Sequence, residues 1–150
     1  MKKILALLAI ALLAGCRQDT NTNNQSVLDS APPLQVRLYC EDIAPGADQP
    51  QFAVYAIINE SKAKITAIGV PCQQIEPAEF ENYQIPNEAL SAVGGWWAGA
   101  GDYFYAKKEG KKIGIYYAGV DEAMEAPGFP YQKVATYDNG KFSVNFPALQ

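Results

Sequence analysis

The chain has 150 residues, with 12 basic and 16 acidic side chains, no histidine and a formal net charge of −4. An acidic chain is a poor partner for nucleic acid, whose phosphates require a basic face. The absence of histidine excludes Ser-His-Asp triads, Cys-His pairs and imidazole metal sites, so the common hydrolase and zinc mechanisms lose their usual groups.

Residues 1–15 have the layout of a secretory signal. Lys2 and Lys3 form a positive start, residues 4–13 are an apolar run of Ile, Leu and Ala, and two small residues precede Cys16. The apolar run is about half the length of roughly twenty residues that a membrane-spanning helix needs. A permanent transmembrane anchor is therefore not expected.

The tetrapeptide Leu13-Ala14-Gly15-Cys16 resembles the lipobox of bacterial lipoproteins. The resemblance implies cleavage before Cys16, a diacylglyceryl thioether on its sulfur, and acylation of its new amine by a fatty acid such as palmitate. Arg17 is not the aspartate that commonly marks inner-membrane retention in such lipoproteins, so the resemblance favours the outer membrane over the inner membrane. The alternative is an ordinary signal peptide with an incidental cysteine.

Residues 17–33 contain almost nothing to bury, so residues 16–33 are predicted to be a lipidated, flexible tether. An ordered extension packed on the domain is the alternative. Residues 34–150 are then a single globular domain, long enough to bury a core. Without residues 1–15, the mature chain keeps ten basic and sixteen acidic residues, a formal charge of −6.

Two cysteines remain beyond the lipobox, Cys40 and Cys72. The signal directs the chain to an oxidising compartment, where paired thiols usually form a disulfide. We therefore predict a Cys40–Cys72 bridge. A redox or metal site is poorly supported, because the spacing differs from that of such sites and the chain has no histidine to add.

The periodicity of the domain is mostly that of strands. Alternating or β-branched segments occupy residues 34–40, 51–60 and 64–70, and two hairpins are expected over 102–120 and 131–146. Asn139-Gly140 is a strong turn signal, because both turn positions need positive φ. We predict a mainly β fold, an antiparallel meander of about seven strands that forms a small barrel or sandwich.

One short helix is expected near residues 86–93, in IPNEALSAVGG. Pro86 suits a first helical turn, and Ala89, Leu90 and Val93 fall on one stripe ahead of two glycines. A second possible helical turn is PAEFENY, residues 77–83.

The most unusual stretch is GGWWAGAGDYFY, residues 94–105. One interpretation is an aromatic platform that binds a sugar or a protein through Trp96, Trp97, Tyr103 and Tyr105, since Trp and Tyr dominate such contacts. The other is that these aromatics fill the core or cover a sheet edge. If the segment is extended, the two adjacent indoles point to opposite faces and one is expected to be exposed.

Acidic residues provide the other chemical candidates: Glu88, Asp102, Asp121, Glu122 and Glu125. Paired carboxylates perform acid–base or glycosidic chemistry when burial raises one pKa. A short loop bounded by Pro and Gly is usually solvated, however, and DxDxDG calcium spacing is missing. No catalytic residue, metal or other cofactor is predicted.

Four lysines surround one turn in KKEGKK, residues 107–112. They can dock on anionic lipid headgroups or glycan, but such a run is more often a solvated hairpin tip that discourages aggregation.

The sequence thus predicts a lipid-anchored lipoprotein of the bacterial envelope, a non-enzymatic module that binds an envelope protein or glycan or contributes to envelope structure. A carboxylate-dependent hydrolase of cell-wall glycan and an inhibitor of an envelope-degrading enzyme are the alternatives.

Overall fold

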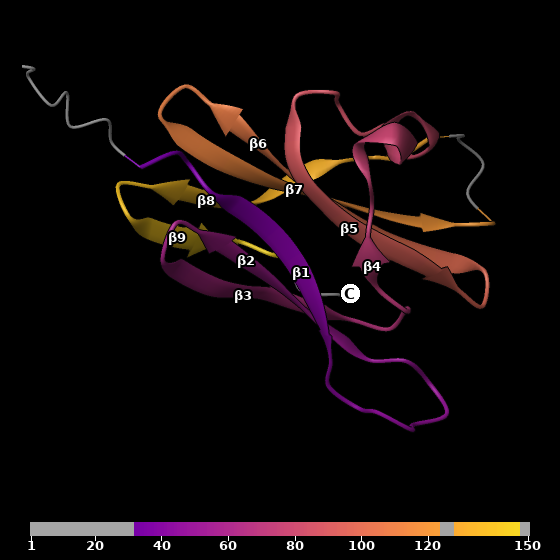
Figure 1. Cartoon of the computed structure of the whole chain (residues 1–150). Helices are drawn as coiled ribbons and strands as arrows, with labels where there is room; N and C mark the ends of the chain where they lie inside the picture. Colours follow the sequence, from indigo (N-terminus) through magenta and orange to yellow (C-terminus); the bar gives the residue numbers. More distant parts are fainter. Residues whose placement is uncertain (1–31, 124–127, 148–150) are drawn as a thin grey trace, which may run out of the picture. The chain divides into compact units, whose positions relative to one another are not determined.

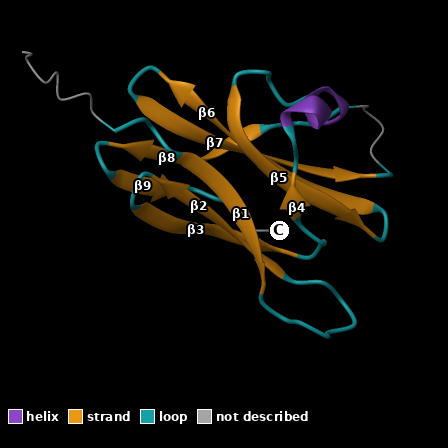
Figure 2. Ribbon diagram, in the orientation of Figure 1, coloured by secondary structure: helices purple, strands orange, loops and turns teal. Residues whose placement is uncertain are grey.

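The computed structural model describes residues 32–123 and 128–147, and Pro33–Gln150 form one compact unit. In the described ranges the chain forms nine strands in two antiparallel sheets, with one 3-10 helix, η1 (Pro77–Tyr83) (Figure 1, Figure 2). The smaller sheet contains β1 (Val36–Asp42), β2 (Phe52–Ile58) and β3 (Ser61–Ile68). The larger sheet contains β4 (Gln73–Gln74), β5 (Ala89–Trp97), β6 (Ala100–Glu109), β7 (Lys112–Asp121), β8 (Gln132–Asp138) and β9 (Lys141–Val144).

Within each sheet, every strand pairs with its neighbour in chain order, so both sheets are meanders and the mainly β prediction is confirmed. The two expected hairpins are present as β6–β7 and β8–β9. Asn139 and Gly140 both have positive φ, 48° and 80°, as the turn signal requires.

The main core lies between the two sheets. Inward-facing residues of both sheets meet across this layer, including the fully buried Leu38 of β1, Val54 of β2 and Phe104 of β6. Burial of such side chains is the dominant stabilising contribution, at about 25 cal/mol for each Å² of apolar surface removed from water.

A second core lies on the other face of the larger sheet. There η1 places Phe80 over β5 and β6, and an aromatic group packs beside it that contains Tyr83, Tyr103, Tyr105, Tyr116, Phe129 and Tyr131. Helix η1 begins with Pro77 at its first turn and a capping box between Glu76 and Glu79. The helical turn suggested for residues 77–83 is therefore present.

The prediction of a helix near residues 86–93 is wrong. Only a single turn forms there, with the Ala89 N–H donating to the Pro86 carbonyl over 2.9 Å, and β5 then begins at Ala89. The small apolar residues that suggested a helical stripe are explained by burial on both faces of a strand: Ala92 faces the second core and Val93 the main core. Short apolar runs of this kind fit a buried strand as well as a helix, and pairing with β6 decides the outcome.

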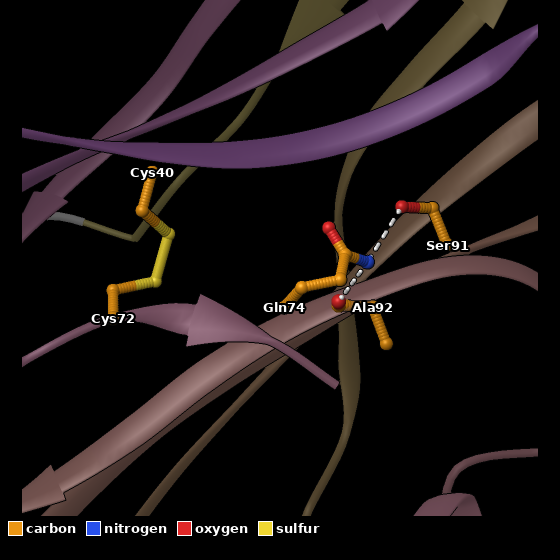
Figure 3. Close-up of a disulfide and its surroundings, with 5 residues drawn as sticks. All are labelled: Cys40, Cys72, Gln74, Ser91 and Ala92. Atoms are coloured by element: carbon orange, nitrogen blue, oxygen red, sulfur yellow. Dashed lines mark hydrogen bonds between the residues drawn. A yellow bond between two sulfur atoms is a disulfide. The ribbon is translucent and has the colours of Figure 1, made fainter. Parts of the chain in front are cut away.

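The predicted disulfide is present between Cys40 on β1 and Cys72, which leads into β4, with a Cα–Cα separation of 5.9 Å (Figure 3). It joins the two sheets covalently. Close by, the Gln74 side-chain amide donates to the Ala92 carbonyl over 2.6 Å, and the buried Ser91 hydroxyl accepts from the Leu38 N–H over 2.9 Å. The same region is thus held by a covalent bond and by hydrogen bonds between strands.

The domain has two distinct ends. At the end where the chain enters β1, here called the entry end, lie the turns at residues 59–60, 110–111 and 139–140 (Figure 1). The Ser61 hydroxyl donates to the Gly140 carbonyl over 3.5 Å, which joins two of these turns. At the opposite end, here called the far end, lie the loop over residues 43–51 and the β5–β6 turn.

Candidate binding site

The β5–β6 hairpin presents both tryptophans of the chain at the far end. Trp97 pairs with Ala100, and the two turn residues between them, Ala98 and Gly99, have φ of 49° and 86°. This is the backbone that a tight two-residue hairpin demands. Trp96 and Trp97 are 46% and 47% exposed, so about half of each residue is available to solvent. Because they are adjacent on a strand, they lie on opposite faces of the sheet.

Trp96 lies on the face that carries the second core. Its ring covers Gly101, where an added Cβ would come within 2.6 Å of Trp96 Cε3. Beside it is a cavity of about 370 Å³ whose wall includes Gln73, Gln74, Glu79, Tyr83, Trp96 and Tyr103. The cavity is within the size range of small-molecule sites and combines aromatic rings with amides and one carboxylate.

Trp97 lies on the face that also carries Asp102. The Tyr117 hydroxyl donates to Asp102 Oδ1 over 2.7 Å. Burial raises the pKa of the Asp102 carboxyl, and the hydrogen bond from Tyr117 opposes that change. Burial and the same hydrogen bond raise the pKa of the Tyr117 hydroxyl. Asp102 is therefore paired with a neutral phenol rather than with a second acid.

Tyr103 and Tyr105 lie inside the second core, at 6% and 5% exposure. Tyr103 stacks on Tyr83 with ring centroids 4.9 Å apart, and Tyr105 stacks on Tyr116 at the same distance. Burial raises the pKa of Tyr105 to about 12. Tyr103 reaches the wall of the cavity, whereas Tyr105 supports the sheet. Of the four aromatics in the predicted platform, the two indoles are the ones that project into solvent.

The remaining acidic candidates do not line the cavity. Asp121 and Glu122 are exposed at the end of β7, where Asp121 Oδ1 accepts from the Ala123 N–H over 2.6 Å. Glu88 is exposed just before β5, and Glu125 lies outside the described residues. In the described part of the chain, no group of three acidic or cysteine side chains is placed to hold a metal ion.

Sequence reasoning missed the other side of the cavity. Gln73, Glu79 and Tyr83 come from β4 and η1, well before the tryptophans in the chain. No periodicity links these residues to the hairpin. The one available signal was Cys72, because its bridge to Cys40 ties the adjoining residues to the sheets.

No helix within residues 32–123 and 128–147 is long and apolar enough to span a membrane. No family model matches the chain, and no curated protein or solved structure is significantly similar to it.

Proposed function

We propose that this protein is a lipid-anchored lipoprotein of the bacterial cell envelope that binds a partner at its far end and catalyses no reaction. The observation that carries the proposal is the pair of half-exposed indoles on opposite faces of one tight hairpin, next to a cavity. Tryptophan is among the side chains most enriched at positions that dominate binding energies. A rigid β-turn holds both rings, which reduces the entropy lost on association.

The arrangement of the acids supports a binding role over glycan hydrolysis. Glycosidases place two carboxyl groups across the bond that is cleaved. Asp102 instead pairs with Tyr117, and Asp121 and Glu122 are solvated. None of the three acids lines the cavity.

The anchor is tested at Cys16. Cells grown with labelled palmitate should yield a labelled protein whose N-terminus begins at residue 16, because the lipobox resemblance implies cleavage and acylation there. The Cys16→Ser variant should remain unlabelled and unprocessed. An unlabelled wild-type protein recovered from the cytosol with Met1 intact contradicts the anchor.

The contact surface is tested at Trp97. Cross-linking in intact cells, with captured species identified by mass spectrometry, should recover at least about tenfold less partner from Trp97→Ala than from wild type. Trp97 is exposed and lies at a turn, so the domain should stay folded. Leu90→Ala is the matched control, because Leu90 lies on the same strand at 45% exposure but toward the entry end.

Equal recovery from Trp97→Ala and Leu90→Ala contradicts the proposed contact surface. Circular dichroism and a thermal melt of both variants separate this outcome from loss of the fold. If Trp97→Ala unfolds the domain, the indole is a core residue and the proposed contact surface is likewise wrong.

A further inference from the structure

The basic side chains of the domain gather toward one end, which no single segment of the sequence reveals. Arg37 is the second residue of β1, and six lysines lie in or close to the three turns of the entry end: Lys62, Lys107, Lys108, Lys111, Lys112 and Lys141. The two other described cations are Lys64, on β3, and Lys133, whose Nζ reaches Glu109 beside the β6–β7 turn over 2.6 Å. All nine described cations therefore belong to the half of the domain that faces the entry end.

The acidic side chains have the opposite distribution. Only four described acids accompany the nine cations, Glu60, Glu88, Glu109 and Asp138, so the entry end carries a formal charge of +5. Toward the far end lie six acids and no described cation, a formal charge of −6: Glu41, Asp42, Asp48, Asp102, Asp121 and Glu122. The other three described acids, Glu76, Glu79 and Glu81, lie on or next to η1, which packs on the second core, and are counted at neither end. The charge of the domain is thus separated along its strands, positive at the entry end and negative at the far end, although its net charge is negative.

Several of the cations are held in defined positions. On the outer face of the smaller sheet, Tyr39 and Tyr55 stack with centroids 5.2 Å apart, and Lys62 Nζ lies 4.2 Å from the Tyr55 centroid. Arg37 lies 5.5 Å from the Tyr39 centroid. Cation–π contacts of this kind fix a charge without neutralising it. In the described part of the chain, Arg37 and Lys62 make no ion pair, and the same is true of Lys108 and Lys111 at the β6–β7 turn.

We propose that the entry end docks on anionic phospholipid headgroups of the bilayer to which the protein is tethered. This inference rests on the proposed lipid anchor. A flexible chain of the length predicted for the tether, residues 17–33, would have a root-mean-square reach of roughly 20–25 Å. The described chain enters β1 at the basic end. Anionic headgroups attract Lys and Arg near the surface, and the attraction decays within about 8–10 Å at moderate salt. The tether therefore brings the cations within the range where the attraction acts.

The charge distribution also determines the orientation of the docked domain. The acidic far end is repelled by the same headgroups, and Tyr39 and Tyr55 are of the residue type enriched at the level of the headgroups. Trp96 and Trp97 then point away from the bilayer that holds the anchor. The proposed partner surface remains accessible while the domain is docked.

Lysine acylation followed by mass spectrometry tests the docking. The processed protein, purified from membranes with its own lipid, is reconstituted into vesicles of phosphatidylcholine alone or with about 30 mol % phosphatidylglycerol. At low salt the acylation of Lys62, Lys108 and Lys111 should slow by about fivefold or more in the anionic vesicles, and high salt should abolish the difference. Tryptophan emission should remain accessible to acrylamide, an uncharged quencher that leaves the ionic strength unchanged, in both. Equal acylation in the two vesicles, or tryptophan shielded only in the anionic ones, overturns the proposal.

Two variants with the same change in charge separate an end-specific effect from net charge. Lys108→Gln with Lys111→Gln removes two positive charges at the entry end, and Ala47→Glu with Gln49→Glu adds two negative charges at the exposed far-end loop. In anionic vesicles, the lysine-to-glutamine pair should return the acylation rate of Lys62 toward its value in neutral vesicles. The pair of added glutamates should leave Lys62 protected. An equal effect of the two pairs overturns the proposal.

Soluble polyphosphate and the lipid on Cys16 provide two further readouts. Polyphosphate added to neutral vesicles could protect Lys62, Lys108 and Lys111 from acylation to the same extent as phosphatidylglycerol. In that case the entry end is a general polyanion site, and the bilayer proposal is overturned. If mass spectrometry shows no lipid on Cys16, the anchor proposal has failed on its own. In that case, the docking proposal requires that the unlipidated chain still floats with anionic vesicles and does not float with neutral vesicles. Any other result means that the docking proposal fails as well.

Discussion

Replacing both Cys40 and Cys72 by alanine should lower the free energy of unfolding by about 3–4 kcal/mol. The bridge closes a loop with a sequence separation of 32 residues, and its loss restores the conformational entropy of that loop in the unfolded chain. Loss of the bridge also affects the candidate site, because the bridge joins the two sheets next to the cavity wall. Urea denaturation followed by circular dichroism measures the change.

A reductant provides the control for the disulfide prediction. It should lower the wild-type midpoint to that of the double variant and leave the variant unchanged. A wild-type protein that resists reductant, or a double variant as stable as wild type, contradicts the prediction.

Gly95→Ala should destabilise the domain by about 3 kcal/mol, at the upper end of the usual cost of overpacking. Gly95 lies between Val93 and Trp97 on the inward-facing side of β5, and a Cβ there would overlap the backbone carbonyl oxygen of Pro71. A carbonyl cannot rotate away as a flexible side chain can. The segment that leads into Cys72 must therefore move, and the cavity wall must move with it.

Gly69→Ala is the matched control, because nothing lies within 4 Å of a Cβ added there and its φ is not positive. It should change stability by no more than about 0.5 kcal/mol. Thermal melts of the two variants compare the effects directly. A Gly95→Ala protein that melts with Gly69→Ala contradicts the close approach of Pro71.

These two predictions concern the same wall of the candidate site. The disulfide holds Cys72 against β1, and the missing side chain of Gly95 allows the backbone carbonyl of Pro71 to lie against β5. Both features therefore position β4 and η1 beside Trp96. A covalent bond and a backbone contact are rigid supports, which is the property that a preformed binding surface needs.

The strands could be predicted where one face of a strand is buried and the other is solvated. Alternation in 34–40 and the Asn139-Gly140 turn correspond to β1 and to the β8–β9 hairpin. Prediction was wrong at β5, because Ala92 and Val93 are both buried by different layers and no alternation remains. Periodicity reports one buried face, so a strand covered on both sides resembles a helix.

The site was predictable only in part for a similar reason. Adjacency alone predicted that Trp96 and Trp97 point to opposite faces if extended. The burial of Tyr103 and Tyr105 depends on η1 and on Phe129 and Tyr131, which arrive from other parts of the chain. The cavity likewise exists only where β4 and η1 meet β5.

From the residues alone follow the properties that act locally: the apolar run ahead of Cys16, the turn at Asn139-Gly140, the absence of histidine and the alternation of most strands. The tertiary structure decided which aromatics are exposed, which residues share the cavity, and that three separate lysine-bearing turns lie at one end. The reason is physical: backbone preferences and composition act within a few residues, whereas burial and the field of many charges depend on segments that only folding brings together.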